Sequence, residues 1–135
     1  ENYIYVVKEL SKLEDIRLRQ TLENESILGD SLLFTLQYYN LQDIVWFSKA
    51  LNAEGIQCSA FGNSEYRNIR CFWNWGFLFN NITIEERKSL LPKTSHYLEN
   101  VIDIPLSPTL EKNDLDDLIL SIKKILKKLK EIRNK

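Results

Sequence analysis

The last quarter of the chain carries the clearest repeat of hydrophobic positions. After residue 113, apolar side chains recur three or four positions apart, at Leu115, Leu118, Ile119, Ile122, Ile125, Leu126, Leu129 and Ile132. This spacing is that of one face of an α-helix. Acidic residues gather at its start and lysines towards its end, as the helix dipole favours, and Asn113 is a candidate N-cap. We therefore predict a long amphipathic helix, and we expect its terminal segment, residues 128–135, to fray.

Two earlier segments also have helical spacing. Residues 2–13 carry apolar side chains on one face, so we expect a linking helix within residues 1–14. Residues 41–54 form a broader apolar stripe between Asn40, a candidate N-cap, and Gly55, which suits the left-handed position after a helix.

Two shorter helices are expected further along the chain. Thr83 is followed by Glu85 and Glu86, which suggests a helical turn. Pro92 can occupy the first position of another short helix, in which we expect Tyr97 and Leu98 to turn inward.

Four segments have the pattern of strands. Residues 15–19 alternate between apolar and polar side chains and predict a short edge strand, whereas residues 31–37 form an apolar run typical of a central strand. Residues 56–61 resume as a strand. Residues 101–106 alternate but contain a proline, which predicts an edge strand or the end of a strand.

The order of these elements predicts the class of fold. It runs helix, strand, strand, helix, strand, irregular segment, short helices, strand and helix. We expect residues 1–135 to form a single α+β domain of two layers, with a small, mostly antiparallel sheet and helices on one face. Gly29-Asp30 ends a polar stretch and predicts the turn before the second strand.

Composition and charge exclude several partners. The net charge is -1, so no global field attracts nucleic acid or an anionic membrane, and no apolar run approaches the ~20 residues of a membrane helix. Cys58 and Cys71 give neither a disulfide framework nor a metal-ligand spacing. We interpret them as reduced thiols of a cytoplasmic protein, with a single bridge as the alternative. The chain contains no methionine, from which we expect it to be part of a longer polypeptide.

The residue types also limit the chemistry. His96 is the single histidine, and a serine or cysteine nucleophile would need it as a base. Zinc requires three or four ligands that one histidine and two separated cysteines do not provide, and no glycine-rich phosphate loop is present. We therefore predict no catalytic residue and no metal site. The lysines near the C-terminus are interpreted as a solvated helix face, with nucleic-acid or lipid contact as the alternative.

Residues 66–78 combine two arginines and two asparagines with five aromatic rings. One interpretation is a structural strand, in which Cys71 and Trp73 point to one side and Arg70 and Phe72 to the other. A second is a stacking platform for single-stranded nucleic acid, which the net charge disfavours.

A third interpretation is a ligand pocket. Arg67 and Arg70 offer planar donors suited to a carboxylate or a polyhydroxyl ligand. Trp73 and Trp75 would form walls that exclude water, and Asn68 would fix the orientation of the ligand.

Three stretches together resemble a known family. They are Ala-Leu-Asn-Ala-Glu-Gly-Ile at 50–56, Arg-Asn-Ile-Arg-Cys-Phe-Trp at 67–73, and a third that runs from Leu-Pro-Lys-Thr at 91–94 through Ile-Asp-Ile-Pro-Leu-Ser at 102–107 to Asp-Leu-Asp at 114–116. In this order and spacing they resemble the C-terminal small domain of the DegT/DnrJ/EryC1/StrS aminotransferases. These pyridoxal-phosphate enzymes of the aspartate-aminotransferase fold aminate keto-sugars and cyclitol ketones. The resemblance covers roughly residues 29–127.

The resemblance implies a substrate-side role. Arg67, Asn68 and Arg70 would contact the carboxylate of the amino donor or sugar hydroxyls, and Trp73 would form the pocket wall. Pyridoxal phosphate would be bound in the parent enzyme by a large N-terminal domain that supplies the Schiff-base lysine, so we expect no cofactor on this chain alone and no activity from it. The implied partners are that domain of the same polypeptide and a second subunit of a homodimer. The alternatives are a non-catalytic protein-binding or scaffolding module with the same fold, and a structural domain without a ligand.

Overall fold

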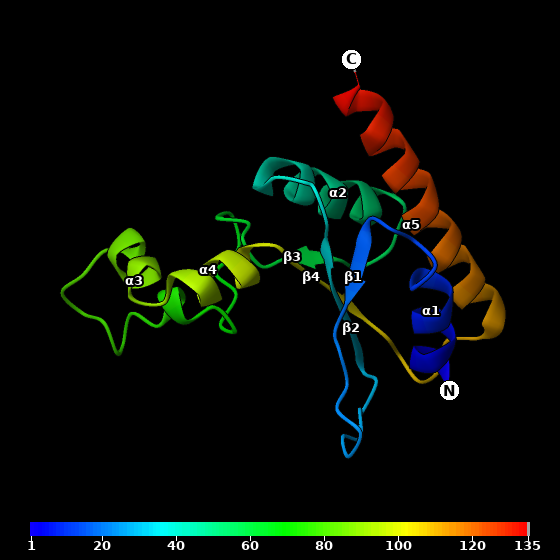
Figure 1. The fold of residues 1–135 in the computed structure, drawn as a ribbon, viewed down its shortest axis with the longest axis horizontal. Helices are drawn as coiled ribbons and strands as arrows, with labels where there is room; N and C mark the ends of the chain where they lie inside the picture. Colours follow the sequence, from blue (N-terminus) through cyan, green and yellow to red (C-terminus); the bar gives the residue numbers. More distant parts are fainter. Residues whose placement is uncertain (135) are drawn as a thin grey trace.

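The computed structural model describes residues 1–134, within which the chain forms five α-helices, one 3₁₀-helix and four strands (Figure 1). In chain order these are α1 (Asn2–Leu10), β1 (Ile16–Leu18), β2 (Ser31–Leu36), α2 (Leu41–Ala53), β3 (Ser59–Ala60), the 3₁₀-helix η1 (Phe72–Asn74), α3 (Ile84–Leu90), α4 (Pro92–Glu99), β4 (Val101–Pro105) and α5 (Lys112–Arg133). Of the terminal segment expected to fray, Lys135 lies outside the described residues, and α5 runs to Arg133.

The four strands form one antiparallel sheet in the order β1-β2-β4-β3. As predicted, β1 lies at an edge and β2 in the interior. β4 is interior too, so the interpretation of residues 101–106 as an edge strand is wrong. β3 is much shorter than the strand predicted at 56–61, and its pairing with β4 ends at Asp103. Pro105 therefore lies at the end of β4, beyond that pairing, where its missing N–H is tolerated.

The main hydrophobic core lies between one face of the sheet and three helices. Leu32, Phe34 and Leu36 alternate along β2 and point to this face, which α1, α2 and α5 cover (Figure 1). The rings of Phe34 and Phe47 meet edge to face, with centroids 6.3 Å apart. The expected two-layer α+β domain with an antiparallel sheet is confirmed. The apolar face of β2 is buried against these helices, which form the second layer.

Side-chain caps set the ends of the helices. Asn40 and Asp43 form a reciprocal capping box at the start of α2, and Gly55 follows the helix with a φ of 87°. α5 begins earlier than predicted. Glu111 is its N-cap, and the backbone N–H of Glu111 donates to the Asp114 carboxylate at 2.8 Å. Asn113 therefore lies inside the first turn, and its assignment as the cap is wrong.

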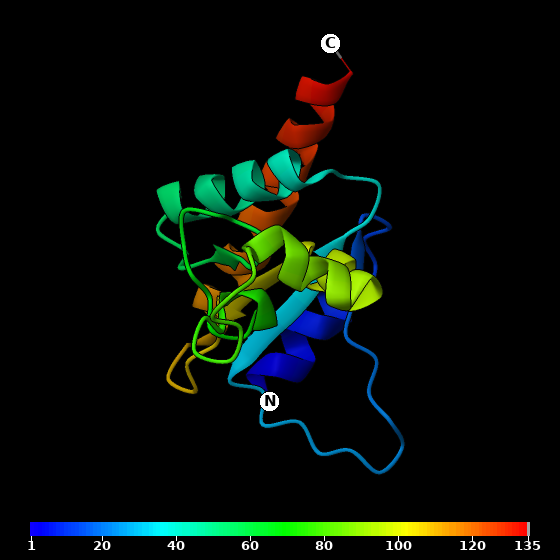
Figure 2. The ribbon, with the colours of Figure 1, turned by 90° about the vertical axis from the view of Figure 1, so that its left-hand side faces the viewer.

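A second, smaller hydrophobic cluster lies in residues 61–100, which we call the lobe and which extends from one end of the sheet (Figures 1 and 2). Four of its buried members, Phe61, Cys71, Phe72 and Trp73, belong to the lobe, and the fifth, Val101, is the first residue of β4. α3 and α4 both belong to the lobe. Leu98 of α4 packs against the cluster, as predicted, but Tyr97 is 53% exposed and does not turn inward.

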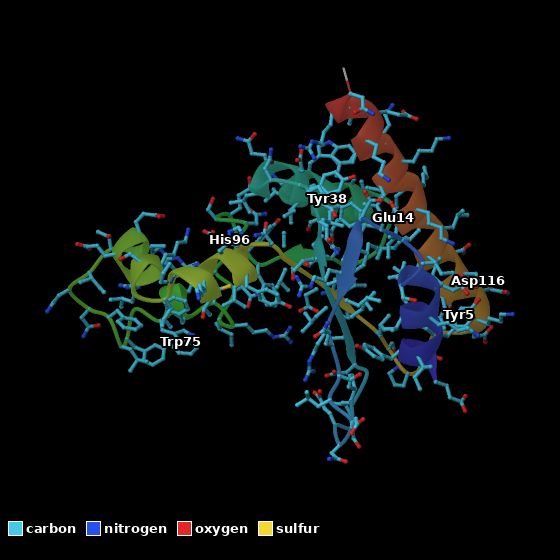
Figure 3. The ribbon with its side chains drawn as sticks, viewed as in Figure 1. Tyr5, Glu14, Tyr38, Trp75, His96 and Asp116 are labelled. Atoms are coloured by element: carbon cyan, nitrogen blue, oxygen red, sulfur yellow. The ribbon has the colours of Figure 1, made fainter. Side chains whose placement is uncertain are left out.

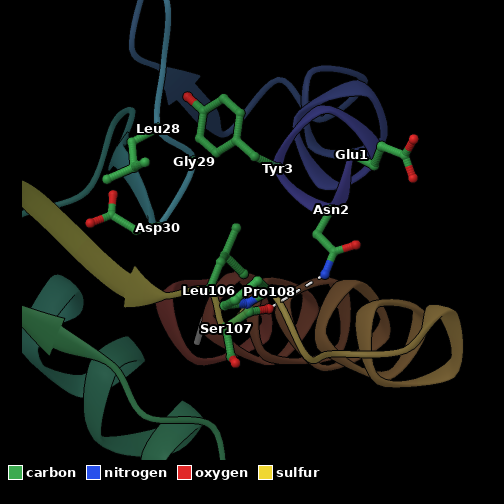
Figure 4. Close-up of a pocket in the computed structure, with 9 residues that line it drawn as sticks. All are labelled: Glu1, Asn2, Tyr3, Leu28, Gly29, Asp30, Leu106, Ser107 and Pro108. Carbon is green, nitrogen blue, oxygen red and sulfur yellow. Dashed lines mark hydrogen bonds between the residues drawn. The ribbon is translucent and has the colours of Figure 1, made fainter.

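Hydrogen bonds join the start of α1 to the segment between β4 and α5 (Figure 4). The Asn2 side chain donates to the carbonyl oxygens of Leu110 at 3.0 Å and Ser107 at 3.4 Å. Gly29 adopts a φ of 76°, which confirms the predicted turn, and a Cβ there would lie 2.9 Å from the Cβ of Tyr3. These contacts border a cavity of about 430 Å³.

Candidate functional site

Residues 66–78 form an irregular loop of the lobe that includes η1. Asn68 organises its first turn. The Asn68 side-chain oxygen accepts a hydrogen bond from the backbone N–H of Arg70, and its carbonyl oxygen accepts one from the Asn74 side chain, both at 2.9 Å. Such local bonds replace the ladder of a strand. The interpretation of this segment as a strand is therefore wrong.

Trp73 belongs to the core of the lobe. It is 4% exposed, and its ring meets that of Phe72 edge to face with centroids 5.4 Å apart. The Lys88 ammonium lies 5.4 Å from the centroid of the Trp73 ring. Trp73 thus offers little surface to a ligand in this conformation, whereas Trp75 is partly exposed near the far end of the lobe (Figure 3).

Arg70 is tied to the sheet by an ion pair. Its guanidinium donates to Oδ2 of Asp103 on β4 and lies 5.8 Å from the centroid of the Phe61 ring. The Arg70 side chain is 55% exposed, but that of Asp103 is only 12% exposed. Arg70 can therefore present its remaining N–H donors to a ligand while its ion pair with Asp103 fixes the position of the guanidinium.

Asp103 lies on the face of the sheet opposite the main core. It is directly opposite Leu33 on β2 and Ser59 on β3. The Ser31 hydroxyl donates to its Oδ1, so both carboxylate oxygens have partners. A buried carboxylate needs such partners, because leaving its charge unpaired would be costly. Asp103 and Ser31 were not predicted as site residues, although a single charged residue in the otherwise apolar strand at 101–105 was a usable signal.

The structure brings only some of the predicted site residues together. Asn68 and Arg70 share a turn, and Arg70 is joined to the sheet. Arg67 is exposed, and within residues 1–134 its guanidinium forms no hydrogen bond or ion pair. Arg67 and the exposed part of Arg70 thus form the polar surface of the loop, and Trp73 lies in the core of the same lobe.

The lysines do not fit a Schiff base with pyridoxal phosphate, which needs an amine that can lose its proton. Among the lysines of residues 1–134, all except Lys88 are exposed. The Lys88 ammonium pairs with Glu99 at 2.9 Å and with Glu85 at 3.5 Å. Burial lowers the pKa of Lys88, but the hydrogen bonds and charges of Glu99 and Glu85 outweigh burial and raise it. Lys88 therefore remains cationic, and no described residue of this chain fits the anchoring role.

The two cysteines are buried, unbonded thiols and do not form the bridge that the sequence left open. Burial raises the pKa of Cys58 to about 12 and that of Cys71 to about 11, so both stay protonated at neutral pH and are poor nucleophiles.

No three His, Cys, Asp or Glu side chains in the described part of the chain are grouped to hold a metal ion. None of the described helices combines the length and apolarity needed to cross a membrane.

No protein-family model and no curated protein sequence matches the chain. Among solved structures, it is similar to a protein assigned as a sugar aminotransferase, Spr1654 from Streptococcus pneumoniae, in three forms. The apo form matches with a TM-score of 0.71 at 16% identity, over 99% of this chain and 32% of that chain. The chain has the fold of one part of a sugar aminotransferase. The PMP form of that aminotransferase gives a TM-score of 0.71 at 15% identity, and the PLP form gives 0.69 at 16%.

The chain thus spans about a third of the length of the sugar aminotransferase that it resembles. In the fold of this chain, the lobe and α5 lie on opposite sides of the sheet (Figure 1). The polar loop with Arg67 and Arg70 is therefore remote from the helix that closes the main core.

Proposed function

We propose that the chain is the C-terminal small domain of a longer, cytoplasmic, pyridoxal-phosphate-dependent aminotransferase of the DegT/DnrJ/EryC1/StrS family, which acts on a keto-sugar or a cyclitol ketone. The observation that carries this proposal is the fold match over 99% of the chain to 32% of a sugar aminotransferase. The three sequence stretches at 50–56, 67–73 and 91–116 support it independently of the fold.

The domain would act on the substrate side of the active site. Arg67 and Arg70 would bind the carboxylate of the amino donor or the hydroxyl groups of the sugar, since guanidinium groups form paired hydrogen bonds with such acceptors. Asn68 would orient them through the turn that it closes. Trp73 would form the inner part of the pocket wall, because it belongs to the same loop and packs in the core of the lobe.

The cofactor chemistry would belong to the rest of the polypeptide. Pyridoxal phosphate supplies an electron sink to such enzymes, and a large N-terminal domain would provide its lysine and phosphate contacts. Since no described lysine here suits that role, this chain alone would bind no cofactor and would be inactive. Its partners would be the large domain and, in the parent enzyme, a second subunit.

The substrate role is tested in the full-length enzyme by Arg67→Ala and Arg70→Ala. Each should raise KM for one of the two substrates by about tenfold, the size expected for losing one charge-assisted hydrogen bond. Lys127→Ala, on the exposed face of α5, is the matched charge-removing control. Unchanged KM values for both substrates in both arginine variants would refute the pocket role.

The inactivity of the chain is tested separately. Mixed with pyridoxal phosphate, it should give no specific imine absorbance band and no transamination of a ketone. A reading frame that extends upstream by about 250 residues, with an α/β pattern and a Schiff-base lysine, would support the parent enzyme, since domains of that size are common. An immediate upstream start codon would contradict it.

A second candidate is a non-catalytic protein-binding or scaffolding module with the same fold. The observation that favours it is the exposure of large apolar side chains in the lobe, including Ile69 at 80% and Phe77 at 76%. Aromatic and arginine residues dominate interface hot spots. A stand-alone gene product that binds a protein through this loop, and that loses binding in Phe77→Ala, would favour the module over the aminotransferase.

A further inference from the structure

A second cavity lies between the end of β2, strand β1 and helix α4. Its volume is about 340 Å³, and Arg17, Tyr38, His96 and Tyr97 are among its lining residues. Figure 3 shows Tyr38 after β2 and His96 on α4, on segments far apart in the sequence. None of these residues belongs to the loop at 66–78, so the cavity is separate from the site proposed above.

Tyr38 has an unusual backbone conformation. Its φ is 68°, in the left-handed region that a bulky residue rarely adopts, and its side chain is 81% exposed. The neighbouring structure enforces this geometry. The Arg133 guanidinium donates to the carbonyl oxygen of Tyr38, and the hydroxyl of the next residue, Tyr39, donates to Asp15 at 3.0 Å. An aromatic ring held in solvent by a strained backbone is a feature that clusters at functional sites.

The charge of the cavity is positive. Arg17 lines it, and within residues 1–134 the Arg17 guanidinium forms no hydrogen bond or ion pair, in contrast to those of Arg70 and Arg133. The imidazole of His96 is exposed and likewise has no hydrogen-bond partner among the described residues. No Asp or Glu is among the lining residues. By comparison, the cavity beside α1 is lined by Glu1 and Asp30.

The rings complete the site. Tyr38 and Tyr97 both line the cavity, are both more than half exposed, and come from different elements, the end of β2 and helix α4. Exposed tyrosine rings stack on flat or weakly polar ligand rings, and a guanidinium binds two oxygens of a phosphate at once.

We propose that this cavity binds a small phosphate ester of an aromatic or sugar alcohol. Arg17 holds the phosphate, with His96 as a second donor, and the two tyrosines stack on the ring of the alcohol. The site does not depend on the aminotransferase assignment.

The test is an NMR titration of the isotope-labelled protein with phenyl phosphate, glucose 1-phosphate and inorganic phosphate. At least one ester should give saturable shifts of the amides of Arg17, Tyr38 and His96. Which ester binds more tightly identifies the aromatic or the sugar ring as the preferred partner. Inorganic phosphate should bind about tenfold more weakly, because stacking of one ring contributes about this much.

Two variants separate the contributions. Arg17→Gln should weaken binding about tenfold or more, by loss of a charge-assisted contact. Tyr38→Gly should also weaken it about tenfold while the fold is kept, because glycine adopts a φ of 68° without strain. Arg19→Gln is the control, since Arg19 pairs with Glu25 and does not line the cavity.

Three results would overturn the proposal. The first is the absence of saturable shifts at the cavity with either ester. The second is equal affinity for inorganic phosphate and both esters. The third is a loss of affinity in Arg19→Gln as large as in Arg17→Gln, which would indicate general electrostatic attraction only.

Discussion

The Arg70 guanidinium forms an ion pair with the Asp103 carboxylate, 33 residues further along the chain. The acid lies in an interior strand and is almost buried, whereas the arginine is half exposed in an irregular loop. A residue of the sheet thus positions the guanidinium of a partly exposed loop residue. Because the Ser31 hydroxyl holds the other carboxylate oxygen, Asp103 cannot turn away without breaking two contacts.

Asp103→Asn tests this anchor. The variant keeps the shape of the side chain but removes its charge, so we expect the free energy of unfolding to fall by about 1 kcal/mol, limited by the solvent exposure of Arg70. Urea denaturation measures the change. Glu65→Gln is the control, because the pair between Lys49 and Glu65 is more than half exposed on both sides and should therefore contribute less to stability than the pair of Arg70 and Asp103. An equal decrease in the free energy of unfolding for both variants would show that the pair of Arg70 and Asp103 stabilises the fold no more than an exposed ion pair does.

Arg87→Ala should destabilise the lobe. The Arg87 guanidinium donates to the carbonyl oxygens of Trp73 at 2.9 Å and Phe79 at 2.6 Å, so its removal leaves two acceptors without partners. We expect a loss of about 2–3 kcal/mol. Amide hydrogen exchange should quicken in the lobe and stay unchanged in β2. Arg67→Ala, which removes an exposed arginine, should change stability by less than about 0.5 kcal/mol. Uniformly faster exchange across the whole chain would disagree with a local role.

Gly29→Ala and Gly55→Ala form a matched pair. Both glycines have positive φ, at 76° and 87°, so alanine should cost about 1 kcal/mol at each from backbone strain alone. At Gly29 the new Cβ would also lie 2.9 Å from the Cβ of Tyr3, whereas nothing lies within 4 Å at Gly55. The Gly29 variant should therefore lose a further 1–3 kcal/mol or so through overpacking. Calorimetry compares the Tm values of the two variants. A decrease in Tm for Gly55→Ala as large as that for Gly29→Ala would argue against the close contact with Tyr3.

Tyr39 should make stability depend on alkaline pH. Burial, followed by the hydrogen bond to Asp15 and its charge, raises the pKa of Tyr39 to about 12 from the usual 10.0. The folded state therefore holds the phenol proton more tightly than the unfolded state, and this contribution is complete below pH 10 and lost as the pH rises to about 12.

The comparison variant is Tyr39→Phe, which removes the phenol but keeps the ring. Urea midpoints measured from pH 9 to 12 should fall more steeply for the natural protein than for this variant, since the variant differs only in lacking the Tyr39 phenol. Parallel slopes would mean that Tyr39 does not carry the effect.

Much of the main core could be predicted because its signals are local and periodic. Leu32, Phe34 and Leu36 alternate along β2, and apolar residues recur along α5 at helical spacing, so the buried face of each element can be read from the sequence. The caps were less certain. Asn113 is the better N-cap by residue type, yet Glu111 caps α5, because the Asp114 carboxylate accepts the hydrogen bond from the backbone N–H of Glu111.

The lobe could not be predicted in the same way. Cys71, Phe72 and Trp73 are buried consecutively, which no helical or strand period describes. Their burial depends on contacts from Arg87 and Leu98, later in the chain. The candidate site shows the same limit. Arg67, Asn68 and Arg70 were proposed from residue type and from the family resemblance, but Asp103, the partner of Arg70, lies on β4 and could not be predicted from the sequence of the loop.

The separate packing of the lobe has a spectroscopic consequence. Trp73 and Trp75, two of the three tryptophans, lie in it, whereas most of the helical backbone belongs to α2 and α5 in the main core. Intrinsic fluorescence therefore reports mainly on one half of the molecule and far-ultraviolet circular dichroism on the other. Any opening of the small cluster ahead of the large one would be visible as two melting curves that fail to superimpose.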